Sequence, residues 1–172
     1  MKIALGTDHR GHVTTDRVVT VLQDEHCQVE VLGNCDGRPC DYPDTAYPVA
    51  RAVANGDADR GILVCGSGIG MCIAANKVRG VRAALVHDEV GAELSRRHND
   101  ANVLCLAAEL TSGRMIEQIV QTWVRCEFDG GRHARRNRKI AAIEAGLDPT
   151  RADLPQEPAP PADPRAIHAA AS

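Results

Sequence analysis

The sequence predicts an α/β fold: a Rossmann-like three-layer sandwich in which a five-stranded parallel sheet has helices on both faces. Three observations favour this class. Short apolar runs alternate with longer amphipathic ones along most of the chain, an order that is typical of a parallel, doubly wound sheet. The run RGILVC at residues 60–65 is apolar nearly throughout, as expected for a central strand covered on both faces. The length of 172 residues is enough for one such domain with a proper core.

Each expected element is predicted from its local pattern. The strand candidates are short runs rich in aliphatic residues, at 2–7, 28–33, 60–65, 81–86 and 102–107. The helix candidates are longer amphipathic stretches, at about 12–26, 43–55, 70–78, 88–97 and 111–126. A break at Gly130–Gly131 precedes a basic helix that ends near Gly146. We therefore expect one domain over residues 1–147, followed by a Pro/Ala-rich tail at 148–172 whose composition is typical of disorder.

The composition disfavours several classes of protein and site. Aromatic residues make up 2% of the chain and the net charge is −3, so neither base stacking nor a general attraction to polyanions is expected. No stretch approaches the roughly 20 apolar residues of a membrane span. Seven cysteines without a CxxC pair favour a reduced, cytoplasmic protein over a disulfide framework or a zinc site. Cys35 and Cys40 share one loop, and we expect their thiols to be incidental there.

A glycine-rich segment, CGSGIG at residues 65–70, comes directly after the third expected strand. Its backbone N–H groups and the start of the next helix could hold an anion, and a thiol beside that helix end has a lowered pKa. Met71 stands where a dinucleotide fingerprint needs glycine and where a phosphatase loop needs arginine. Taken alone, the segment leaves two interpretations open: an anion site with a reactive Cys65, or a tight turn with a buried structural thiol.

Other polar groups lie where the expected strands and helices end. Asp8 and His9 come after the first strand, at the same sheet edge as Cys65. The alternative to a functional role is a structural one, in which Asp8 caps the next helix and the His9 imidazole is solvated. Arg132 and Arg136 are four residues apart in the basic helix and could clasp one phosphate. Their alternative is a solvated basic face.

Five segments together resemble the type B ribose-5-phosphate isomerase family, in order and over about residues 1–146. They are DHRG at 8–11, DYPD at 41–44, CGSGIG with IAANK over 65–77, SRRHNDANVL at 95–104 and GGRHARR at 130–136. The resemblance implies an aldose–ketose isomerase, an intramolecular oxidoreductase of the pentose phosphate pathway. It would interconvert ribose 5-phosphate and ribulose 5-phosphate through a cis-enediolate, with no metal and no cofactor.

The resemblance also implies a catalytic role for four residues. Cys65 matches the base that moves a proton between C1 and C2, working as a thiolate with a depressed pKa. Ser67 matches a hydroxyl that assists proton movement at C1 and O1. His98 matches the group that opens the furanose ring, and Asp8 would hold sugar hydroxyls or the ring oxygen. Some members use a glutamate after the loop as base, and Met71 in that position assigns this chain to the subgroup with a cysteine base.

The remaining matched positions are expected to bind substrate. The backbone of the 66–70 loop would form an anion hole for the enediolate oxygen, Asn99 would contact the enediolate, and Tyr42 would pack near the sugar. The phosphate would be held by His9 and two arginines. The full expected binding set is His9, Tyr42, Gly66, Gly68, Ile69, Gly70, Asn99, Arg132 and Arg136.

Members of the family are dimers, so the resemblance implies a homodimer, or a dimer of dimers, with shared active sites. His98, Asn99 and the two arginines would come from the partner, and an isolated monomer should be inactive.

Three alternatives remain open at this point. The substrate could be another sugar or sugar phosphate, such as allose 6-phosphate, galactose 6-phosphate or a free aldose. The chain could be a non-catalytic sugar-phosphate-binding module, although that role would not need Cys65 and His98 together. A nucleic-acid binder using RHARRNRK at 132–139 is a third possibility, against which charge and aromatic content weigh. We therefore expect neither nucleic acid nor a membrane as partner.

Overall fold

The computed structural model of the protein describes residues 1–35 and 37–151. Most of the expected Pro/Ala-rich tail, from residue 152 onward, lies outside the described residues. The chain divides into two compact units, Met1–Phe128 and Asp129–Ser172.

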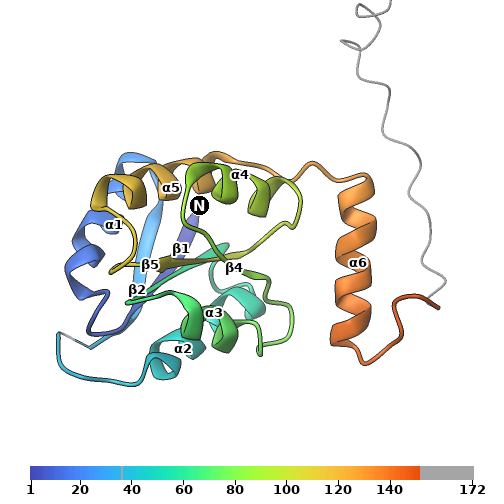
Figure 1. Ribbon diagram of the computed structural model, residues 1–172, viewed down its shortest axis with the longest axis horizontal. Coiled ribbons are helices and arrows are strands. Elements are labelled where there is room, and N and C mark those ends of the chain that lie inside the picture. The colour runs from blue at the N-terminus through green and yellow to red at the C-terminus, as the bar shows by residue number, and fades with distance from the viewer. Residues whose placement is uncertain (36, 152–172) are drawn as a thin grey trace, which may run out of the picture. The chain divides into compact units, whose positions relative to one another are not determined.

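The first unit contains a five-stranded, all-parallel sheet, as the sequence predicts (Figure 1). The order across the sheet is β2-β1-β3-β5-β4. The strands are β1 (Lys2–Thr7), β2 (Gln28–Asn34), β3 (Arg60–Cys65), β4 (Ala83–Leu85) and β5 (Val103–Ala107). The strand expected at 81–86 is shorter than predicted because β4 lies at the edge of the sheet and pairs with β5 alone, over three residues.

Helices cover both faces of the sheet, so the predicted three-layer sandwich is confirmed. One layer holds α1 (His12–Asp24), α4 (Glu89–Arg97) and α5 (Gly113–Arg125), and the other holds α2 (Tyr42–Asn55) and α3 (Ile69–Ala75) (Figure 1). The central strand β3 is buried at all six residues. Because side chains alternate along a strand, Ile62 and Val64 enter the first core while Leu63 and Cys65 enter the second.

The topology has a switch point at the carboxyl edge of the sheet, between β1 and β3. Strands β1 and β3 are neighbours, yet the chain leaves β1 toward α1 on one face and leaves β3 toward α3 on the other. Loops that diverge in this way open the space in which doubly wound proteins bind ligands. A ligand site is therefore expected at the residues directly after β1 and β3.

The second unit contains the basic helix that the sequence predicts, α6 (Arg132–Glu144). The break before it is confirmed, since Gly130 and Gly131 have φ values of 66° and 53°, a region that favours glycine. Within residues 1–35 and 37–151, no helix is long and apolar enough to cross a membrane.

Candidate active site

Asp8 organises the loop after β1. Its carboxylate is buried, at 4% exposure, and Oδ1 accepts the backbone N–H groups of Arg10 and Gly11, each at 2.9 Å. The Asp8 N–H in turn donates to the carbonyl of Val64 on β3, at 3.2 Å. These bonds use one carboxylate oxygen to shape the loop, and the Asp8 N–H holds the loop against the end of β3.

The Cys65 thiol lies at the centre of the glycine loop. The N–H of Gly68 donates to Cys65 Sγ at 3.1 Å, and the N–H groups of Ser67 and Met71 also act to lower the thiol pKa. Burial has the larger effect and raises the pKa of Cys65 above its ordinary value, with Asp8 adding to the increase. The expectation of a depressed pKa is therefore wrong for this chain, because removing the thiolate from water outweighs the loop's donors.

At two positions of the loop, neighbouring side chains leave no room for a residue larger than glycine. Gly68 has a φ of 73°, and a Cβ there would lie 2.4 Å from Cδ1 of Leu85. A Cβ on Gly70 would lie 2.5 Å from Cζ of Tyr42, so the tyrosine ring lies directly on the loop. Tyr42 is the first residue of α2 and is 42% exposed. The structure thus brings the expected Tyr42 and glycine-loop positions together.

Ser67 and Ile69 carry the side chains between the loop glycines. Ser67 is half-buried, and its Oγ accepts the N–H of Ile69 at 3.4 Å. The Ile69 side chain is 53% exposed, so this residue can contribute its backbone to a ligand but does not enclose one with its side chain.

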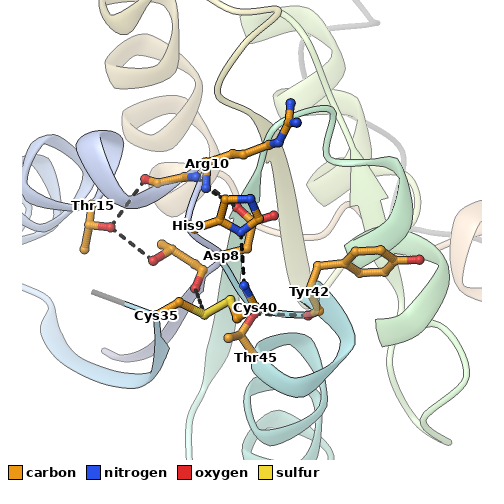
Figure 2. The surroundings of a disulfide bond; sticks show 10 residues. Asp8, His9, Arg10, Thr15, Cys35, Cys40, Tyr42 and Thr45 are labelled. Atoms are coloured by element: carbon orange, nitrogen blue, oxygen red, sulfur yellow. Dashed lines mark hydrogen bonds between the residues drawn. A yellow bond between two sulfur atoms is a disulfide. The ribbon is translucent and has the colours of Figure 1, made fainter. Parts of the chain in front are cut away.

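His9 contacts the loop between β2 and α2. Its Nδ1 accepts the N–H of Cys40 at 3.4 Å, and its side chain is half-buried. Cys40 is joined to Cys35 by a disulfide (Figure 2). The expectation of reduced, incidental loop thiols is contradicted here, because the chain folds back within five residues and brings the two sulfur atoms together beside His9.

An ion pair that sequence reasoning missed covers Gly66. Nη1 of Arg10 donates to both carboxylate oxygens of Glu109, at 2.8 and 2.9 Å, and a Cβ on Gly66 would lie 2.9 Å from Cδ of Arg10. The Glu109 N–H donates to the carbonyl of Gly66 at 3.0 Å. Glu109 comes after β5 just as Asp8 comes after β1, so the strand-end rule that indicated Asp8 could also have indicated Glu109.

A second thiol, Cys72, lies on α3 behind the loop. It is half-buried, and hydrogen bonding from the fully buried Cys105 lowers the pKa of Cys72 to about 7. Cys72 therefore has a larger thiolate fraction at neutral pH than Cys65, although its sequence position in an apolar helix indicated only a packing role.

His98 and Asn99 lie at the opposite edge of the sheet from Cys65. His98 is the C-cap residue that follows α4, and the chain enters β5 at Val103. Val103 pairs with Gly61, near the start of β3, whereas Cys65 pairs with Ala107. Within one chain, His98 is therefore about one strand length, on the order of 15 Å, from Cys65.

The segment at that amino edge is held rigidly. The buried Arg96 donates to Oδ1 of Asp100 at 2.9 Å and to the carbonyl of Ala101 at 2.7 Å. Arg82 donates to the carbonyl of Asn99 at 3.1 Å. The backbone of the His98–Asn99 pair is thus fixed in place by cations on either side of it.

Arg132 and Arg136 belong to the second unit, on the first turns of α6. Both side chains reach solvent and are four residues apart on one helix face, as predicted. Nε of Arg132 is 3.3 Å from Nε2 of His133.

Comparison with known proteins identifies relatives that match most of the chain. The family model described as Ribose/Galactose Isomerase matches residues 3–140. The chain is 41% identical to ribose-5-phosphate isomerase B of Escherichia coli over 143 residues, covering 83% of this chain and 96% of the relative. It is 38% identical to D-erythrulose-4-phosphate isomerase of Pectobacterium atrosepticum over 145 residues, covering 84% and 95%. The structure of ribose-5-phosphate isomerase B from Clostridium thermocellum matches with a TM-score of 0.83 at 43% identity, covering 85% of this chain and 99% of that one.

Proposed function

This chain belongs to the Ribose/Galactose Isomerase family, and from that premise we propose that it interconverts ribose 5-phosphate and ribulose 5-phosphate through a cis-enediolate. That it is a sugar-phosphate isomerase of the aldose–ketose type is established by the family and its relatives. The observation that carries the finer proposal is that Asp8 and Cys65 lie together where β1 and β3 end: the Asp8 N–H donates to the carbonyl of Val64, and Asp8 affects the pKa of the Cys65 thiol.

Cys65 would act as the base that takes a proton from C2 of the aldose and returns it to C1. Thiolate is needed for this step, and the N–H of Gly68, which donates to Sγ, stabilises it. As the enediolate forms, negative charge grows on the substrate oxygen, and the backbone of residues 66–70 would supply donors for it. Ser67 would assist proton movement at C1 and O1.

Ring opening and phosphate binding would involve residues that follow β1 and residues supplied by a second copy of the chain. His98 would protonate the ring oxygen, while the second carboxylate oxygen of Asp8 would hold a sugar hydroxyl. Asn99 would contact the enediolate. His9, Arg132 and Arg136 would bind the phosphate, and the Tyr42 ring would pack against the sugar.

The separation of His98 from Cys65 supports a homodimer with shared active sites. A single chain holds these residues at opposite edges of its sheet, so the acid and the base can meet only if another copy supplies one of them. Exposed apolar side chains lie beside both half-sites: Ile69 and Ile73 on α3, and Val90 and Leu94 on α4. A dimer that covers them would remove apolar surface from water while completing the site.

The proposal requires neither metal nor cofactor, places the enzyme in the cytoplasm, and needs no nucleic acid or membrane partner.

The proposed reaction is tested by assaying EDTA-treated enzyme on pentose 5-phosphates, hexose 6-phosphates and free aldoses. We expect the highest kcat/KM with ribose 5-phosphate. A higher kcat/KM for another sugar would reassign the substrate. Because one relative is a D-erythrulose-4-phosphate isomerase, the assay also includes a tetrose phosphate.

The role of Cys65 is tested by Cys65→Ala. Loss of the base should lower kcat by about 10³-fold while circular dichroism and the unfolding midpoint stay close to those of the parent. Cys72→Ser is the matched control, since Cys72 is a neighbouring thiol with a lower pKa and no assigned role. Activity that survives Cys65→Ala but is lost in Cys72→Ser would contradict the proposal.

A further inference from the structure

The disulfide between Cys35 and Cys40 closes the loop that joins β2 to α2. Figure 2 shows the disulfide below His9, which follows β1 in the chain. Cys35 Sγ lies 3.9 Å from the carbonyl oxygen of Thr7, and the N–H of Cys40 donates to Nδ1 of His9 at 3.4 Å. Both ends of the bond therefore contact the strand end that carries the proposed phosphate ligand.

The Cys40 contact determines the tautomer of neutral His9. A neutral imidazole has one donor and one acceptor nitrogen. Because Nδ1 accepts the N–H of Cys40, the ring proton of neutral His9 must be on Nε2. Nε2–H is then a donor, which is what a phosphate oxygen requires. If the 35–40 loop moved, Nδ1 would lose its partner and the two tautomers would no longer be distinguished.

The same loop also anchors Tyr42. Asp41 precedes the first turn of α2, and Tyr42 is the second residue after Cys40. Its ring lies on Gly70 of the glycine loop. One short segment therefore positions two residues that the proposed function assigns to substrate binding, His9 and Tyr42.

The disulfide lies in a partly exposed part of the chain. Cys35 and Cys40 are half-buried, and residues 37–39 between them are all exposed. Cys105, by contrast, is fully buried in the core, and Cys65 is 4% exposed.

We propose that Cys35 and Cys40 form a redox modification site that controls substrate affinity through His9 and Tyr42. The proposal rests on the proposed function, whose phosphate end it regulates. In the oxidised form the disulfide holds His9 as an Nε2–H donor. A dithiol reductant breaks the bond in two exchange steps: its first thiolate attacks one sulfur, its second releases the other, and it leaves as its own cyclic disulfide. Two protons and two electrons pass to the protein, which gains two thiols and a loosened loop.

The kinetic test compares the oxidised enzyme with enzyme reduced by dithiothreitol. On reduction we expect KM for ribose 5-phosphate to rise about fivefold, the size expected when one positioning hydrogen bond is lost, while kcat changes less than about twofold. The double variant Cys35→Ser/Cys40→Ser should have the KM of the reduced enzyme under both conditions. The control Cys126→Ser, whose half-buried thiol belongs to a different part of the fold, should keep the full response.

Two readouts do not depend on turnover. Mass spectrometry after alkylation should find Cys35 and Cys40 blocked in the oxidised protein and labelled after reduction. Nitrogen NMR of His9 should show one tautomer in the oxidised form and a mixture in the reduced form, and inorganic phosphate titrated against that signal should bind more weakly to the reduced form.

The outcomes separate this proposal from the proposed function. If the NMR and phosphate responses appear but no aldose phosphate is isomerised, the redox site stands and the assigned reaction is wrong. If isomerisation is found but KM is the same in both redox forms, the redox site is overturned. A double variant that still responds to oxidant would also overturn it, since another thiol would then be responsible.

Discussion

At the scale of single residues, Cys65 is under two opposing influences. Burial raises the pKa of its thiol, whereas the N–H groups of Gly68, Met71 and Ser67 lower it, and burial has the larger effect. A thiol with a raised pKa has a small thiolate fraction at neutral pH, but its thiolate is a stronger base, as proton abstraction from carbon requires. The neighbouring Cys72, with a pKa of about 7, would be more ionised but a weaker base.

This balance predicts the pH dependence of the reaction. Because the pKa of Cys65 is raised, we expect kcat/KM for ribose 5-phosphate to increase with pH beyond the ordinary thiol pKa of about 8.5. A plateau already reached at about pH 7, near the pKa of Cys72, would contradict Cys65 as the base.

The same shift affects stability in a defined direction. A group whose folded pKa is raised stabilises the fold fully below its unfolded pKa, and that contribution is lost as pH rises through the folded pKa. Circular dichroism recorded at each pH therefore has to accompany the rate measurements, so that a loss of folded enzyme at high pH is not taken for a catalytic effect.

At the scale of elements, the site depends on how strands end. β1 and β3 are ordinary buried strands, and the chain turns sharply after each of them. Asp8 caps the loop after β1 with its carboxylate, and Gly68 reverses the loop after β3 with a positive φ. The glycine loop is also packed from outside by Leu85 and by the Tyr42 ring. Its shape is therefore held by neighbouring elements as well as by its own backbone.

Gly68→Ala tests that packing. The substitution combines an unfavourable φ with a Cβ 2.4 Å from Leu85, so we expect the free energy of unfolding to fall by about 3 kcal/mol. Activity should fall too, since the Gly68 N–H that meets Cys65 would be displaced. Gly56→Ala is the matched control: its φ is 80° but nothing lies within 4 Å of the new Cβ. It should cost only about 1 kcal/mol and leave kcat unchanged, and equal effects of the two substitutions in urea titrations would refute the packing argument.

At the scale of the whole molecule, the sheet itself separates the proposed catalytic groups. Cys65 lies at its carboxyl edge and His98 at its amino edge, with the length of β3 between them. No rotation of side chains closes a gap of that size. A second copy of the chain is the simplest structure that can bring an acid to the base, and this is why the proposed site is shared.

Mixing two inactive variants tests this arrangement. Cys65→Ala and His98→Ala homodimers should both be inactive, but a mixed dimer would have one intact site, formed by the unchanged residue of each chain. Random exchange makes half of the dimers mixed, so activity should return to about a quarter of the parent value. Refolding the two variants together and measuring ribose 5-phosphate turnover checks this. Activity that stays at the background of the separate variants would show that each chain carries its own complete site.

What the sequence determined by itself was local. The periods of the apolar residues placed every strand and helix of residues 1–146 to within a few positions, because core burial imposes those periods on the chain. The strand-end rule then indicated Asp8, His9 and the glycine loop at one edge, and the structure places Asp8 close enough to Cys65 to affect the pKa of its thiol.

Only the tertiary structure decided three features of the site: an ion pair, a disulfide and the direction of the Cys65 pKa shift. Each depends on residues that are far apart in the chain or on how a group is buried. The Arg10–Glu109 pair joins residues 99 positions apart, and the Cys35–Cys40 bond beside His9 depends on how its loop packs on β1. The direction of the Cys65 pKa shift was mispredicted for the same reason. A pattern shows a helix end next to the thiol, but only the folded chain shows how completely water is removed from it, and for a buried thiol that removal has the larger effect.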